Sequence, residues 1–344
     1  MLNIEKSVKV LEGCDSSNLP IEVMQSTQPI LLKGLVKDWP VVSAGQHSKE
    51  KAIEYLLQFY DSKPVVAFLA APESEGRLFY NEDMSGFNFK AVRGKLDEIL
   101  AELLKYVGSE SHALGDAKVP TCYVGSTNID HWFPAFRQHN DLALEAYDPL
   151  ASIWLGNQSK IAAHYDFPSN IACCVAGHRR FTLFPPEQLG NLYVGPIDFT
   201  PAGQAISLVD FDHPDYEKYP KFRDAIKAAQ VAELEPGDAL YLPSMWWHHV
   251  ESFDAFNILV NYWWRSTPEY TGAPSDALLH ALLAFKSLPE EQRVIWQNML
   301  NFYVFDSDEE SVAHIPKARR GVLGPLNEKL AQSIRQQLSN NLKD

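Results

Sequence analysis

The chain is poor in basic residues relative to acidic ones. Its 344 residues include 30 Lys and Arg against 44 Asp and Glu, which gives a formal net charge of −14 at pH 7. Broad affinity for a phosphate backbone arises when Lys and Arg displace counterions from the nucleic acid. The charge balance therefore argues against DNA binding, and we expect no nucleic-acid partner.

Long apolar runs and cysteines are also scarce. No stretch approaches the roughly 18 consecutive apolar residues of a membrane span, and residues 1–6 lack the charged-then-apolar pattern of a signal peptide. The four cysteines form no CxxC pair, and the adjacent Cys173 and Cys174 would point to opposite faces of a strand. These absences predict a cytoplasmic protein with no membrane partner and with reduced, mostly buried thiols.

What the chain does contain is ample apolar material for a core, since 46% of its residues are hydrophobic and 12% aromatic. Three regions differ in pattern. Residues 1–118 mix short strands and helices and are expected to pack on the rest. Residues 119–270 are short β-like runs broken by Pro, Gly, Asn and Asp, which is typical of a β-sandwich or jelly roll. Residues 271–344 have the apolar spacing of helices.

The same periodicities predict individual elements. The charged stretch from residue 185 to 230 interrupts the strands, and an insertion of that length in a compact domain is typically functional or disordered. Helices are predicted over residues 49–60 and part of 89–106, then over 275–285, 289–303 and 326–342. Strands are predicted at residues 65–69, 121–124, 151–155, 161–165, 170–175, 180–184, 239–242 and 256–264.

The most informative motif is His164-Tyr165-Asp166, which is followed further along the chain by His248 in a Trp-Trp-His-His segment. Residues i and i+2 of a strand share a face, so His164 and Asp166 can reach one metal while Tyr165 points away. Two imidazoles and one carboxylate can occupy one face of an octahedral metal and leave the opposite face open, as in non-haem Fe(II) oxygenases. The pattern predicts an enzyme with a metal centre.

Two choices stay open at this level. His248 and His249 compete for the third ligand position, because neighbours in an extended segment face opposite ways. A 2-oxoacid that chelates the metal also needs a cation for its far carboxylate. After the hairpin turn that Gly177 permits, Arg179 and Arg180 lie on opposite faces of the return strand, and either can be a surface residue.

A wider pattern is carried by five ordered segments, residues 164–170, 177–186, 189–196, 236–248 and 257–263. Together they resemble the cupin-like JmjC hydroxylases, and within that family most of all the asparaginyl hydroxylases of hypoxia-inducible factor. The resemblance covers most of the chain. It implies a mainly β (α+β) fold, a double-stranded β-helix of the jelly-roll type, with an N-terminal α/β extension and C-terminal helices that form a homodimer.

The resemblance also implies the cofactors and the site. The metal is Fe(II) and the cosubstrate is 2-oxoglutarate, with His164, Asp166 and His248 as the iron ligands. Arg179 takes the place of the basic residue that binds the far carboxylate, which is usually Lys in the nearest relatives. Three further residues match positions that line the cosubstrate pocket, namely Asn170, Asn261 and Tyr123. Trp263 matches an aromatic residue beside the iron.

The implied function is that of a 2-oxoglutarate- and Fe(II)-dependent dioxygenase that uses O2 to hydroxylate a protein or peptide side chain. N-methyl demethylation and small-molecule hydroxylation are alternatives with the same chemistry. A metal-binding regulatory protein of the cupin fold, and a zinc or manganese cupin isomerase or hydrolase, are rivals from other classes. The target stays open, because the Arg-Gln pair of the asparaginyl hydroxylases falls near Ala205 and Ile206, whose side chains cannot form hydrogen bonds.

Overall fold

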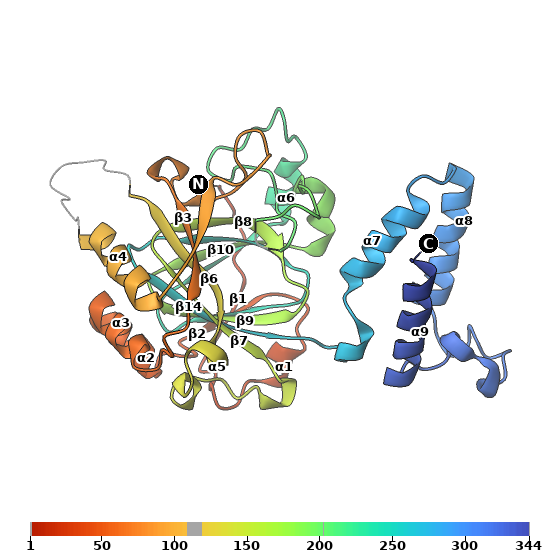
Figure 1. Ribbon diagram of the computed structural model, residues 1–344, viewed down its shortest axis with the longest axis horizontal. Helices are drawn as coiled ribbons and strands as arrows, with labels where there is room; N and C mark the ends of the chain where they lie inside the picture. Colours follow the sequence, from red (N-terminus) through yellow and green to blue (C-terminus); the bar gives the residue numbers. More distant parts are fainter. Residues whose placement is uncertain (1, 109–118, 202, 344) are drawn as a thin grey trace. The chain divides into compact units, whose positions relative to one another are not determined.

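The computed structural model describes residues 2–108, 119–201 and 203–343. The chain forms two compact units, Met1–Arg265 and Ser266–Asp344 (Figure 1). The first unit holds the N-terminal region and the predicted jelly roll together, because strands from both share one sheet. The predicted boundary between residues 118 and 119 adjoins residues 109–118, which lie outside the described residues. The second unit begins slightly before the predicted residue 271.

A nine-stranded sheet forms one wall of the first unit. Its central strands pair antiparallel, and strands from the N-terminal region extend it at both edges. In spatial order the strands are β1 (Lys9–Glu12), β2 (Ile30–Lys33), β12 (Ala239–Leu242), β9 (Ser169–Ala176), β14 (Asn257–Trp264), β7 (Leu150–Gly156), β6 (Thr121–Asn128), β3 (Val65–Ala70) and β5 (Phe89–Gly94).

A five-stranded sheet packs against the first. Buried side chains of β9, β12 and β14 from the large sheet and of β10, β11 and β13 from the small sheet form one apolar cluster between them. Two sheets closed over a common interior are the jelly-roll arrangement, so the predicted fold is confirmed. The order in the small sheet is β11 (Gln230–Leu234), β10 (Arg179–Phe184), β13 (Trp247–Ser252), β8 (Ser159–Tyr165) and β4 (Arg77–Leu78).

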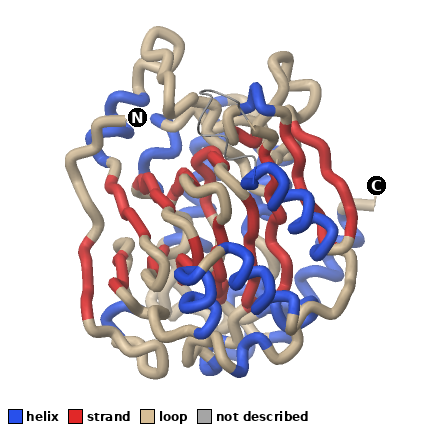
Figure 2. The backbone as a smooth tube through the Cα atoms, turned by 90° about the vertical axis from the view of Figure 1, so that its left-hand side faces the viewer, coloured by secondary structure: helices blue, strands red, loops and turns tan. Residues whose placement is uncertain are grey.

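Helices cover the outer face of the large sheet. α2 (Pro40–His47), α3 (Lys49–Leu57) and α4 (Leu96–Gly108) bury apolar side chains in one cluster with those of β3, β6 and β7. Figure 2 shows helices lying in front of the strands on this side of the molecule. The helix predicted at residues 49–60 is thereby confirmed, and it ends at Leu57.

The predicted strands of the first unit are present with small shifts at their ends, and two of the departures from the prediction bear on the site. Residues 89–94 form strand β5 and the helix begins only at Leu96, because pairing with β3 decides the conformation of a segment whose local pattern is ambiguous. The segment that carries His248 is strand β13. Local alternation does not reveal it, since all of its residues are buried.

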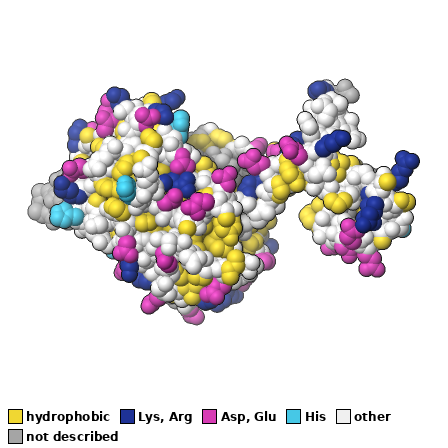
Figure 3. Space-filling model, turned by 90° about the horizontal axis from the view of Figure 1, so that it is seen from below, with side chains coloured by type: hydrophobic (Ala, Val, Ile, Leu, Met, Phe, Trp, Pro, Cys, Tyr) yellow, Lys and Arg dark blue, Asp and Glu magenta, His cyan; other side chains and the backbone are white. Residues whose placement is uncertain are grey.

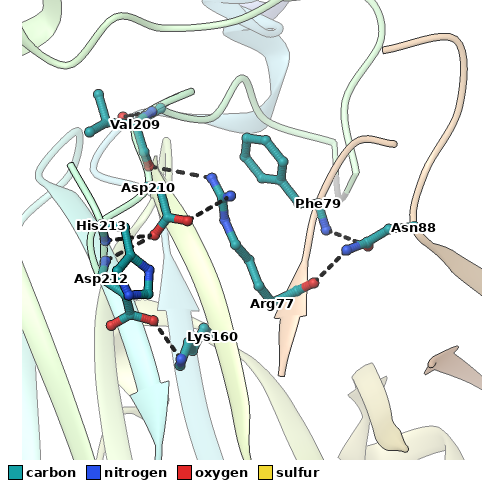
Figure 4. Close-up of polar contacts among 9 residues, drawn as sticks. Arg77, Phe79, Asn88, Lys160, Val209, Asp210, Asp212 and His213 are labelled. Carbon is teal, nitrogen blue, oxygen red and sulfur yellow. Dashed lines mark hydrogen bonds and ion pairs between the residues drawn. The ribbon is translucent and has the colours of Figure 1, made fainter. Parts of the chain in front are cut away.

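The insertion between β10 and β11 contains helix α6 (Phe222–Ala228) and is tied to the small sheet by two ion pairs. Arg77 of β4 binds Asp210, with Nη1 and Oδ2 3.3 Å apart, and Lys160 of β8 binds Asp212 (Figure 4). Because β8 also carries His164, these pairs hold the insertion beside the strand of the predicted metal ligand.

The second unit is helical, as predicted, with α7 (Pro274–Phe285), α8 (Glu290–Leu300) and α9 (Glu328–Asn341). Neither α7 nor α8 has a buried residue, although both contain many apolar side chains. No helix in the described part of the chain is long and apolar enough to span a membrane.

Candidate metal and cosubstrate site

His164, Asp166 and His248 come together on the inner face of the small sheet. His164 lies near the end of β8 and Asp166 just beyond it, while His248 lies on β13 and pairs directly with His164. One ligand atom of each lies within 4.8 Å of those of the other two, and Nε2 of His248 is 3.7 Å from Oδ2 of Asp166. Three ligands at this spacing can hold one divalent ion from one side.

Hydrogen bonds fix the orientation of both imidazole rings. Nδ1 of His164 donates to the carbonyl oxygen of Ala162 at 2.9 Å, and Nδ1 of His248 donates to that of Trp246 at 3.0 Å. A carbonyl oxygen can only accept, so Nδ1 carries the proton in each ring. The lone pair of each Nε2 is therefore left for a metal.

The surroundings also favour the protonation states that a metal needs. Burial, and after it the neighbouring charge of His164, lowers the pKa of His248 to about 4, so this ring is neutral at pH 7. The indole N–H of Trp263 donates to Oδ2 of Asp166 at 3.0 Å and holds the carboxylate in place. Trp263 thus lies beside these three side chains.

His249 points away from this site. The pairing of β13 with β8 shifts register between His248 and Val250, and the His249 ring packs on Phe211 with ring centroids 4.5 Å apart. His249 is buried on the side of the insertion, whereas His248 lines the inner cavity. The geometry therefore brings His248, and not His249, to the other two ligands.

All of the residues predicted for the site line one cavity of about 500 Å³ between the two sheets. Its walls are mostly apolar, with a few converging polar groups, as in small-molecule sites generally. The small sheet and the turn after β8 contribute His164, Asp166, Arg179 and His248, and the large sheet contributes Tyr123, Asn170, Asn261 and Trp263.

Arg179 is a buried cation in this cavity. It is 3% exposed, its Nε has no hydrogen-bond partner, and no acidic side chain in the described part of the chain forms an ion pair with it. Burial lowers the pKa of Arg179. Burial also raises the pKa of Tyr123, and the charge of Arg179 offsets only part of that rise. An isolated buried charge is costly, so the guanidinium fits a carboxylate that enters with a ligand.

Arg180 lies on the opposite face of β10. It borders a small space shared with His249 and Glu251, outside the main cavity. Arg180 has contacts of its own on that side. Of the two arginines that strand alternation leaves open, Arg179 is therefore the one that faces the metal ligands.

Several cavity residues carry no sequence signal. Nε1 of Trp154 donates to Oδ1 of Asn261 at 2.6 Å, and Nδ2 of Asn261 lies 3.4 Å from Oδ1 of Asn170, so Trp154 sets the direction of both amides. Arg93 and Gln204 also line the cavity. They come from β5 and from the insertion, which only the tertiary structure brings to the site.

Comparison with known proteins gives the family. Residues 16–270 match the model of the Cupin-like domain, and the chain belongs to this family. JmjC proteins of the family are generally dependent on Fe(II) and 2-oxoglutarate.

Individual relatives differ in what their names describe. The chain is 34% identical over 122 residues to Lysine-specific demethylase JMJ31 of Arabidopsis thaliana, which covers 34% of this chain and 21% of that protein. It is 34% identical over 145 residues to tRNA wybutosine-synthesizing protein 5 of Gallus gallus, a match that covers 38% of this chain and 42% of that protein. It is 25% identical over 281 residues to Jumonji C domain-containing protein 5 of Drosophila melanogaster, a match that covers 76% of this chain and 63% of that protein. The chain thus spans less than two thirds of the length of each relative.

Proposed function

We propose that this protein is a 2-oxoglutarate- and Fe(II)-dependent oxygenase that hydroxylates a protein or peptide side chain. One observation carries the proposal: the His164, Asp166 and His248 set and the unpaired, buried Arg179 open into the same cavity. A structural metal site needs no buried cation nearby. A dicarboxylate cosubstrate needs a metal for one end and a cation for the other.

The residues present fit both groups. When bound, Fe(II) with 2-oxoglutarate and O2 supplies the chemistry that oxidises an unactivated C–H bond. His164 and His248 would hold the metal through Nε2, and Asp166 through a carboxylate oxygen. Arg179 would bind the far carboxylate of the cosubstrate, and the mostly apolar walls keep bulk water from the reacting groups.

A protein or peptide target is favoured over the alternatives by charge and by the shape of the cavity. The net charge of −14 opposes a nucleic-acid substrate, and acidic and basic side chains are interspersed on the face that Figure 3 shows. The cavity extends to the exposed strand β5, where a long substrate can be held. N-methyl demethylation and small-molecule hydroxylation use the same chemistry and stay the alternatives.

From the resemblance to the asparaginyl hydroxylases of hypoxia-inducible factor we carry over the chemistry and not the target. By the resemblance, the Arg-Gln pair that holds their target side chain falls near Ala205 and Ile206. Ile206 lines the cavity and Ala205 is buried outside the lining, and neither side chain can form a hydrogen bond. Gln204 offers the nearest amide in that segment. We therefore propose a target other than theirs.

The test begins without oxygen. Adding 2-oxoglutarate to the Fe(II) protein should produce a visible charge-transfer band, and admitting O2 should release succinate. His248→Ala should lose both, whereas His249→Ala should keep most of each. A protein that binds Fe(II) but shows neither band nor succinate would instead be a regulatory cupin. An active His248→Ala beside an inactive His249→Ala would reverse the ligand assignment.

A further inference from the structure

We propose that the edge strand β5 binds the substrate as an extended peptide and that Arg93 selects a peptide with an acidic residue. The inference rests on the proposed function, since this peptide is the one that the metal centre would oxidise. It adds the class of substrate and the surface that recognises it.

β5 continues the wall of the cavity outward to the edge of the large sheet. Directly paired residues of antiparallel strands share a face of the sheet. Arg93 pairs with Val66 of β3, and Phe68 of β3 pairs with Tyr123 of β6. All four side chains line the cavity. One continuous surface therefore leads from the edge strand to the cosubstrate pocket.

The outer edge of β5 has no partner strand in the described part of the chain. β5 is last in the strand order, and β3 is the strand with which it pairs there. Apart from the ladder with β3, no backbone hydrogen bond within the described residues joins residues 89–94 to another segment. Residues 90–93 are exposed. Such an edge presents unpaired N–H and C=O groups, to which an extended peptide can add as a further strand.

Arg93 makes this edge selective for acidic groups. Apart from the buried Arg179, it is the only Lys or Arg among the described residues that line the cavity. It is exposed and forms no ion pair with any residue that the structure describes. In a chain of net charge −14, an exposed guanidinium at the rim of a cavity attracts carboxylates, which it can bind through two parallel hydrogen bonds.

A cation on an edge strand can also protect the strand from aggregation or bind RNA. Arg93 fits these two roles less well than the binding of an acidic peptide. Lys on an edge strand protects it from aggregation. Lys90 fits that role, because it pairs with Leu69 on the face away from the cavity lining, but Arg93 faces the cavity. RNA is also acidic, yet one exposed Arg in an acidic chain is weak support for a polyanion. RNA is therefore an outcome of the test.

The test uses two pools of fluorescent ten-residue peptides with the same apolar composition, one with a single Glu in each peptide and the other with a single Lys. Binding is measured by anisotropy on the full chain loaded with Mn(II) and 2-oxoglutarate. The wild type should bind the Glu pool about five- to tenfold more tightly than the Lys pool. Arg93→Glu should abolish or reverse this preference, and Arg93→Gln should reduce it. Lys90→Glu, the matched control, should retain it.

Amide hydrogen exchange locates the bound peptide. The Glu pool should slow exchange in residues 89–94 and not in β1, the edge strand at the other end of the sheet. The proposal is overturned if the wild type shows no preference, if Arg93→Glu keeps it, if exchange in β5 is unchanged, or if a ten-nucleotide RNA binds more tightly than the Glu pool. The charge-transfer band of the wild type tests the proposed function separately, and the band in each variant reports correct folding.

Discussion

Arg179 carries more of the cosubstrate hypothesis than any other side chain. A buried charge without a counter-ion is unfavourable, and the guanidinium of Arg179 is 3% exposed and lacks a partner at Nε. A ligand carboxylate would relieve that cost, so we expect Arg179 to contribute strongly to the binding of the proposed cosubstrate. Tyr123 lines the same cavity as Arg179, and the charge of Arg179 offsets part of the rise in the pKa of Tyr123 that burial causes.

We expect Arg179→Ala to weaken 2-oxoglutarate binding by roughly 10- to 150-fold, because hydrogen bonds to charged groups contribute about 1.5 to 3 kcal/mol. Titration of the charge-transfer band gives the dissociation constant. Arg180→Ala is the control and should change it little, since Arg180 lies outside the cavity. Equal losses in both variants, or an unfolded Arg179→Ala, would remove the cosubstrate role.

The thiols give a second prediction for single residues. Burial raises the pKa of Cys122 to about 11 and that of Cys174 to about 12, and it also raises the pKa of Cys173. Burial and the charge of Glu22 also raise the pKa of Cys14, but this thiol is partly exposed, whereas the other three are buried. Only the thiolate is nucleophilic, so at about pH 8 a thiol reagent should modify Cys14 in the folded protein and all four cysteines after denaturation. Cys14→Ser should abolish the fast reaction, and rapid loss of a second thiol would contradict the burial of the other three.

Among the elements, the turn before β12 aligns the part of the large sheet that carries Asn170. Asp238 is 3% exposed and accepts hydrogen bonds from the backbone N–H of Gly34 at 2.8 Å and of Glu235 at 2.9 Å. Gly237 has a φ of +104°, and a Cβ there would lie 3.0 Å from Cα of Lys37. The turn thus fixes β12 between β2 and β9.

Asp238→Ala should lower the free energy of unfolding by about 2 to 4 kcal/mol, because it leaves two backbone donors without their acceptor. Urea denaturation followed by tryptophan fluorescence measures the change. Glu235→Ala is the matched control, because Nζ of Lys33 binds both carboxylates, Oδ2 of Asp238 at 2.8 Å and Oε2 of Glu235 at 2.9 Å. The Glu235 side chain is 65% exposed, so its loss should cost less than about 1 kcal/mol. Similar losses in both variants would show that the buried acceptor is not what stabilises the turn.

For the whole molecule, the second unit poses the question of association. Leu279 of α7 is 53% exposed and Leu283 is 74% exposed, and Val294 of α8 is 51% exposed. Among the described residues of this unit, the buried ones are Val312, Arg320 and Ala331. Exposed apolar groups on this scale mark interaction surfaces. We propose that they form the interface of a homodimer.

Leu283→Glu should therefore produce monomers or aggregates with reduced turnover, because obligate interfaces resemble a divided core and often leave no stable monomer. Light scattering and succinate release are the measurements. Gln292→Glu, at an exposed polar position of α8, should leave the dimer intact. A monomeric wild type at micromolar concentration would rule the dimer out.

Much of the site could be predicted from sequence because its chemistry restricts residue types and because strand alternation has a period of two. His164 and Asp166 are two residues apart, and Arg179 and Phe181 follow the hairpin glycine on one face, so each pair reaches the cavity together. The helices at the C-terminus could be predicted equally well, because their apolar residues recur at helical spacing.

Strand alternation leaves open the choice between His248 and His249 and that between Arg179 and Arg180. The family resemblance favours His248 and Arg179, but only the tertiary structure shows that these two side chains face the cavity, because each choice depends on which face of a strand meets the other sheet. The same holds for β5 as a strand and for Arg93 in the cavity wall. Their partners are distant along the chain, and a local window contains no information about a distant strand. The sequence determined the chemistry that the site can hold, and long-range pairing decided which side chains face it.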